Sequence, residues 1–124
     1  MAVSATQRTL QLLKEQGRKC AIVEKFNYWV GEHGIRQDMF GIIDIVALDF
    51  DKGVIGVQST TGSQYADHFR KLTIERAVQT TDWLRTPGTF LELWAWRKLK
   101  VKRGGKAMKW VPRITNITLE DINI

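Results

Sequence analysis

The sequence predicts an α/β (α+β) fold in which helices pack against one mixed sheet. Short apolar segments rich in β-branched residues alternate with segments whose apolar residues recur every three or four positions. Along the chain their order is helix, strand, two strands joined by a tight turn, helix, strand and strand. This order predicts an αβββαβ core followed by one further strand, with helices covering the sheet.

The composition predicts a single folded domain over residues 1–124. The chain is 44% hydrophobic and 26% charged, which is typical of a globular protein and not of a disordered one. No apolar run approaches the roughly 20 residues that a membrane helix needs. The N-terminus lacks the pattern of a secretory signal, and the single Cys20 excludes an internal disulfide. We therefore expect a cytoplasmic protein without a membrane partner.

An amphipathic helix is predicted over residues 4–16. Ser4 and Gln7 have the spacing of a capping box, and Gly17 suits the position after the last turn. Ser4 is therefore expected to begin this helix and Gly17 to end it.

A first strand is predicted over residues 19–26. Glu24 falls on an otherwise apolar face of this strand, either as a residue at the rim or as a carboxylate directed toward Asp44. Residues 27–37 contain two glycines and are predicted to form a loop that can touch a ligand, with Arg36 near its end.

Two strands joined by a tight turn follow, over residues 41–48 and 54–60, with the turn at residues 49–53. Each strand carries one polar residue within its apolar run, Asp44 in the first and Gln58 in the second. A carboxylate inside a buried strand is costly unless another group pairs with it. Asp44 is therefore the main candidate functional residue of the chain.

A second helix is predicted over residues 64–85, with a break near Thr73. Thr61 or Ser63 is expected to cap its N-terminus, and Pro87 with the glycine after it ends it. The following strand, over residues 89–99, is apolar on both faces. Such a strand is expected either at the centre of the sheet or with one face lined by aromatic side chains.

The last predicted element is a partner strand over residues 108–117, which returns after a turn at two glycines. Together these strands form a basic ribbon over residues 97–117, outside a core of residues 4–96. Eight basic and no acidic residues lie between Arg97 and Arg113, so without this segment the net charge changes from +6 to −2. This favours contact with DNA, although lysines also protect exposed sheet edges. The expected nucleic-acid-binding residues are Arg36, Lys98, Lys100, Lys102, Arg103, Lys106 and Lys109.

The tight turn also predicts which residues face each other. With the turn centred on Asp51, Asp44 and Gln58 lie opposite one another, about 5 Å apart. Their oxygens, with the Ser59 carbonyl nearby, are ligands suited to Mg²⁺ or Mn²⁺. Such a cation activates water and neutralises charge during phosphodiester hydrolysis. The alternative is that Asp44 only accepts hydrogen bonds from backbone amides.

Residues 41–44 (Gly-Ile-Ile-Asp) and 58–60 (Gln-Ser-Thr) resemble the motif of the PD-(D/E)xK nuclease superfamily, in particular its Holliday junction resolvase-like and VRR-NUC-like branches. The runs over residues 36–44 and 56–63 also resemble small phage-type proteins. The resemblance implies a restriction-endonuclease-like core, binding of Mg²⁺ or Mn²⁺, DNA as the partner and a homodimer. It implies catalytic positions at Asp44, Gln58 and Thr60, with metal ligands at Asp44, Gln58 and, as an accessory acid, Glu24.

Thr60 departs from the motif, because the superfamily has a lysine at this position. A hydroxyl provides no cation to stabilise the transition state, and losing one such contact lowers the rate by about 10²–10³. Either a cation has migrated from elsewhere in the chain, or cleavage is lost and binding retained. The candidates for a migrated cation are Lys71, Arg70 and Arg36.

Three functions follow from the sequence. The first is a metal-dependent DNA endonuclease or resolvase-like phosphodiester hydrolase. The second is a catalytically inactive nucleic-acid-binding module on a nuclease-derived fold. The third is a structural or interaction protein whose ribbon pairs with another subunit.

Overall fold

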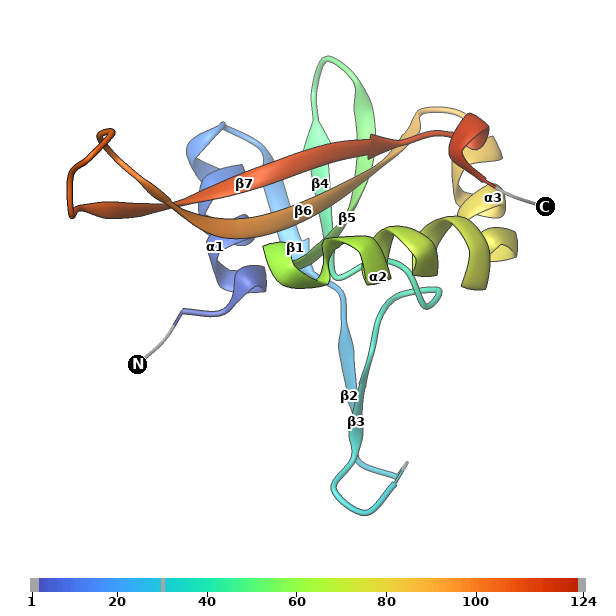
Figure 1. Ribbon diagram of the computed structural model, residues 1–124. Coiled ribbons are helices and arrows are strands. Elements are labelled where there is room, and N and C mark those ends of the chain that lie inside the picture. The colour runs from blue at the N-terminus through green and yellow to red at the C-terminus, as the bar shows by residue number, and fades with distance from the viewer. Residues whose placement is uncertain (1–2, 30, 123–124) are drawn as a thin grey trace.

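The fold is a five-stranded mixed sheet with helices on both faces (Figure 1). The computed structural model describes residues 3–29 and 31–122. The strand order is β1-β4-β5-β6-β7; β5 and β6 are parallel and the other neighbours antiparallel. The elements are α1 (Ala5–Glu15), β1 (Lys19–Ile22), β2 (Lys25–Asn27), β3 (Ile35–Gln37), β4 (Ile45–Asp49), β5 (Gly53–Thr61), α2 (Tyr65–Arg70), α3 (Ala77–Arg85), β6 (Thr89–Lys100) and β7 (Met108–Ile117).

Each face of the sheet has its own apolar core. On one face Leu13 of α1 packs with Trp94 and other buried side chains, while on the opposite face Leu72 packs with Leu93. Side chains of β6 alternate between the two cores, so the prediction that this strand is buried on both faces is confirmed. Helix α1 also begins as predicted, because the Ser4 hydroxyl accepts a hydrogen bond from the Gln7 amide at 3.2 Å.

The β4–β5 hairpin has the predicted register. Ile45 faces Val57 at the end of the ladder, and Asp44 lies just outside it, with its amide donating to the Val57 carbonyl at 2.9 Å. The hairpin's first strand was predicted to start at residue 41, which is wrong, because β4 begins only at Ile45. A turn at Phe40 and Gly41, both with positive φ, keeps residues 41–44 outside β4.

Residues 25–29 and 31–37 form a two-stranded arm that projects from the body (Figure 1). The predicted strand over residues 19–26 is confirmed over Lys19–Ile22 and ends earlier than predicted. The predicted loop over residues 27–37 is wrong at its two ends, where Asn27 belongs to β2 and Ile35–Gln37 form β3. The chain leaves the sheet after β1 because the amides of Val23 and Glu24 both donate to the Asp44 carbonyl, at 2.8 and 3.3 Å. Instead of extending β1, the chain continues into β2 and returns as β3.

The second helical segment is interrupted at the predicted place. A wider π-helical turn over Lys71–Glu75 separates α2 from α3, and the Thr73 hydroxyl donates to the Phe69 carbonyl at 2.8 Å. Such turns are frequent at functional sites. The predicted N-cap is wrong, because the hydroxyls of Thr61 and Ser63 bond to each other at 3.1 Å and a 3₁₀ turn precedes α2.

Strands β6 and β7 confirm the predicted last pair of strands. They pair from Leu91–Ile117 at one end to Lys100–Met108 at the other. The inner half of β7 is thus part of the main sheet, and the segment that extends beyond the body is shorter than the predicted 97–117. Within the described residues, no helix combines the length and apolar character that crossing a membrane requires.

Candidate active site

Three carboxylates meet at the point where the arm joins the sheet. Oxygens of Glu24, Asp38 and Asp44 all lie within 4.8 Å of one another. Glu24 follows β1, Asp38 follows β3 and Asp44 immediately precedes β4, so the arm's departure and return bring them together. Carboxylate oxygens are the ligands that Mg²⁺ and Mn²⁺ prefer. The donor set therefore suits a hard divalent cation.

Asp44 is the buried member of the cluster, with a relative exposure of 5%. Its Oδ2 accepts a hydrogen bond from the Ser59 amide at 2.8 Å. This corrects the expectation that the Ser59 carbonyl faces the site, since it is the N–H of this residue that does. Burial, followed by the hydrogen bond to Asp38 and the charge of Asp38, raises the pKa of Asp44 to about 8.

Asp38 belongs to a network with Gln58 and Lys71. Its Oδ2 accepts from Lys71 Nζ at 2.8 Å and from Gln58 Nε2 at 3.1 Å, and Lys71 Nζ also donates to Gln58 Oε1 at 2.9 Å. Although burial opposes ionisation, the hydrogen bond from Asp44 and the Lys71 ammonium lower the pKa of Asp38 to about 2. The two aspartates thus share one proton near neutral pH, and Lys71 balances the remaining charge.

Among the candidate cations, Lys71 is the one that reaches this network. It projects from the π-helical turn that separates α2 from α3. Arg36 instead pairs with Glu24 at 3.6 Å, and Arg70 is exposed. The Thr60 hydroxyl, at the motif position, donates to Gln64 Oε1 at 3.3 Å.

Sequence reasoning missed Asp38. Its carboxylate lies beside Gln58, although the two residues are 20 positions apart. The one signal in the sequence was an acidic residue at the entry to the apolar run that contains Asp44. That signal is weak, because only the return of β3 against β2 brings Asp38 back to the sheet.

The network opens into a cleft of about 510 Å³ on the α2–α3 side of the arm. Asp38 and Lys71 line it together with the cations of Arg36 and Arg76. Two arginines and a lysine beside a carboxylate cluster provide charge for an anionic substrate. The cleft is therefore suited to a phosphate group next to a bound cation.

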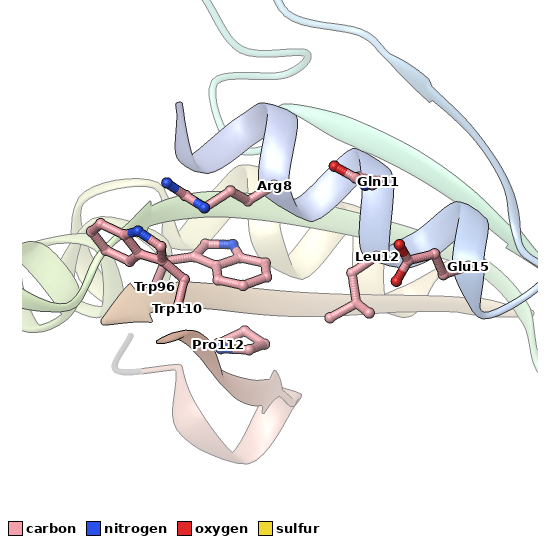
Figure 2. A pocket seen from close by; sticks show the side chains of 7 residues that line it. All are labelled: Arg8, Gln11, Leu12, Glu15, Trp96, Trp110 and Pro112. Carbon is pink, nitrogen blue, oxygen red and sulfur yellow. The ribbon is translucent and has the colours of Figure 1, made fainter. Parts of the chain in front are cut away.

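The basic ribbon is fixed against α1 on the other face of the sheet. Arg8 of α1 lies 4.4 Å from the Trp110 ring centroid, and Lys98 Nζ lies 5.6 Å from it. A groove of about 350 Å³ runs between helix and ribbon, and Figure 2 shows Arg8 beside the two tryptophans. Its lining residues are Arg8, Gln11, Leu12, Glu15, Trp96, Trp110 and Pro112.

The predicted nucleic-acid-binding residues lie on this ribbon, apart from Arg36 on the arm. All six ribbon residues named as candidates are exposed. They are Lys98, Lys100, Lys102, Arg103, Lys106 and Lys109. Exposure and a common sign suit them to phosphate contacts.

Comparison with protein-family models, with curated proteins and with solved structures finds no match for this chain. The side chains of the site are therefore the basis for its function. These are the three acids, Gln58 and Lys71.

The proton shared by the two aspartates predicts how stability depends on pH in metal-free protein. The pKa of Asp44 rises from 3.8 to about 8 on folding, so the folded chain binds more protons than the unfolded chain between these values. We expect the free energy of unfolding to fall as pH rises through this window, by at most about 1.4 kcal/mol per pH unit. Asp38, whose pKa is lowered to about 2, acts only below about pH 4, where stability rises with pH.

Asp44→Asn tests this expectation, because an amide keeps the acceptor for the Ser59 N–H and does not ionise. Urea denaturation in EDTA from pH 4.5 to 8.5 should give a flatter stability curve for the variant than for the wild type. Parallel curves would contradict the raised pKa of Asp44.

Proposed function

We propose that the protein is a metal-dependent DNA endonuclease of the PD-(D/E)xK type. The observation that carries the proposal is Lys71 Nζ, 2.9 Å from Gln58 Oε1 and 2.8 Å from Asp38 Oδ2, beside the three-carboxylate cluster. The order α1, β1, β4, β5, α2 and β6 supports it, because it matches the αβββαβ core that the resemblance implies.

The carboxylates are the residues that would hold the cation. When bound by Asp44, Asp38 and Glu24, Mg²⁺ or Mn²⁺ supplies charge neutralisation and activation of water. Burial and the neighbouring Asp38 raise the pKa of Asp44, so cation binding would release its proton. Gln58 positions both partners, because its Nε2 donates to Asp38 and its Oε1 accepts from Lys71.

Lys71 supplies the cation that Thr60, at the motif position, cannot supply. In hydrolysis a water oxygen bonds to phosphorus, the bond from phosphorus to one sugar oxygen breaks, and negative charge grows on the phosphate oxygens. The Lys71 ammonium, already held at the network, stabilises that charge without reorganising. Its hydrogen bond to Asp38 holds its side chain at the network.

Cleavage assays test the proposal directly. Purified protein is incubated with supercoiled, linear duplex and four-way-junction DNA in Mg²⁺ or Mn²⁺, with parallel samples in EDTA. We expect products that require the cation. Failure to cut any of these DNA forms with either cation would contradict it.

The basic ribbon supports DNA as the partner and gives a separate prediction. Replacing Lys100, Lys102 and Arg103 by glutamate should lower the slope of log affinity against log salt by about 2–3, because each lost phosphate contact removes about 0.9. Fluorescence anisotropy on a labelled duplex between 50 and 300 mM NaCl measures this slope. The matched control replaces the exposed Lys14, Lys19 and Lys52 by glutamate and should change the slope less. Equal effects of the two triple variants would exclude the ribbon as the contact.

The second candidate function is a DNA-binding module that does not cut. The closed network of Lys71, Asp38 and Gln58 favours it, because these three side chains already hydrogen-bond to one another. Salt-sensitive DNA binding without cleavage in the assays above would select this function. A dimer in sedimentation without DNA affinity at low salt would select a structural role instead.

A further inference from the structure

The arm is joined to the candidate site through both of its strands. Lys25 pairs with Gln37 at its base, and the residues immediately outside this pair are Glu24 and Asp38. Both acids belong to the three-carboxylate cluster. Figure 1 shows the arm and the basic ribbon leaving the body in different directions. The base of the arm therefore adjoins the proposed metal ligands, and the arm lies apart from the ribbon.

The arm exposes aromatic side chains. Trp29 is 95% exposed and Tyr28 is 77% exposed, whereas aromatic rings of this size are usually largely buried. The Phe26 ring contacts the Tyr28 ring edge to face, with centroids 4.5 Å apart. Two flat apolar surfaces thus face water beside a polar site, which is typical of a contact surface.

The conformation that presents these rings is held by specific contacts. The Asn27 side-chain oxygen accepts a hydrogen bond from the Trp29 amide at 3.0 Å, and Asn27 Nδ2 donates to Gln37 Oε1 at 3.4 Å. Gly34 has a φ of +79°, and a Cβ there would overlap the Phe26 ring. The turn that carries Trp29 is therefore built by hydrogen bonds and a required glycine.

The same residues enclose a hollow of about 450 Å³ on the arm. It combines aromatic rings, two side-chain amides and one ammonium group: Lys25, Phe26, Asn27, Tyr28, Trp29 and Gln37. Aromatic rings stack on nucleobases, amides match base edges, and a lysine pairs with phosphate. Gln37 also lines the cleft that holds Asp38 and Lys71, so the two hollows adjoin.

We propose that the arm binds an unpaired nucleobase of the DNA substrate, next to the phosphodiester bond that is cut. This inference rests on the proposed function. A base within a duplex already stacks on both neighbours, so only an unpaired or extruded base has a free face for Trp29 or Tyr28. The arm consequently selects flaps, bulges and junctions over continuous duplex, while the ribbon holds flanking DNA through its phosphates.

The test measures binding separately from cleavage. The full chain carrying Asp44→Asn is titrated in EDTA against a duplex with one bulged 2-aminopurine nucleotide and against a duplex in which 2-aminopurine is paired. We expect about tenfold tighter binding of the bulged DNA and quenching of its fluorescence by stacking. Adding Tyr28→Ala and Trp29→Ala should abolish both effects and leave duplex affinity within about twofold, because the ribbon is intact.

The matched control is Phe50→Ala, which removes an aromatic ring that is 82% exposed on the β4–β5 turn, outside the arm. It should keep the preference and the quenching. An unchanged preference in the double arm variant, or none in the starting protein, would overturn the inference. So would concentration-dependent self-association in sedimentation that the arm substitutions abolish, since the rings would then contact a second copy.

Cleavage by the protein with Asp44 intact separates this inference from the proposed function. Arm-dependent quenching without cleavage of any DNA in Mg²⁺ or Mn²⁺ supports the base site and contradicts the nuclease. Cleavage that is equal on bulged and continuous duplex and unaffected by the arm substitutions supports the nuclease and overturns the base site.

Discussion

Asp44→Asn is expected to lower metal-dependent DNA cleavage by at least about 10³-fold while DNA affinity changes by less than about twofold. The carboxylate is the buried member of the cluster, and an amide in its place brings no charge to a cation. The fold should persist, because the amide oxygen can accept the Ser59 N–H that Asp44 accepts. Rates are measured on a junction substrate in Mg²⁺ and in Mn²⁺.

The matched control for this variant is Asp51→Asn, which makes the same chemical change at an exposed position in the turn of the same hairpin. It should cleave within about twofold of the wild type. Equal cleavage by wild type and Asp44→Asn would show that the acid cluster is not the active site. Loss of cleavage in both variants would show that the hairpin, and not the carboxylate, is what the reaction requires.

Lys71→Ala is expected to lower the cleavage rate by about 10²–10³ with little change in DNA affinity, the size of effect seen when one preorganised donor is removed. Adding Thr60→Lys to this variant should raise its cleavage rate at least about tenfold. Thr60 and Gln58 lie on the same face of β5, so a lysine there starts from the motif position and reaches toward the space that Lys71 leaves. Single-turnover rates report this effect without contribution from product release.

Lys14→Met is the control for general loss of a helical lysine, because Lys14 is exposed on α1, which covers the other face of the sheet. It should cleave as the wild type does. A Lys71→Ala variant with wild-type rates would remove this lysine from the mechanism. A loss that Thr60→Lys reverses would instead identify a cation at this point as what the site requires.

Local pattern was enough to predict the hairpin that contains Asp44 and Gln58. A short turn between two alternating strands leaves little freedom in register, and Ile45 indeed faces Val57. The burial of both polar residues was also predictable, because each interrupts an apolar run. These are consequences of residues close together in the sequence.

The arm was not predictable in the same way. Residues 25–27 and 35–37 are exposed or half-buried and lack an alternating apolar pattern, so their pairing leaves little trace in hydrophobicity. Whether the chain leaves the sheet after β1 depends on the carbonyl of Asp44, which accepts the amides of Val23 and Glu24. That contact joins segments 20 residues apart.

The sequence by itself determined the mixed α/β fold, the hairpin register and the concentration of positive charge on the last two strands, because each follows from periodicity, turn residues or composition. Tertiary structure alone decided which groups surround Asp44. The return of the arm brings Asp38 to the site, and the π-helical turn between α2 and α3 brings Lys71 to Asp38. Contacts between side chains so far apart in sequence depend on how whole elements pack, which no local pattern encodes.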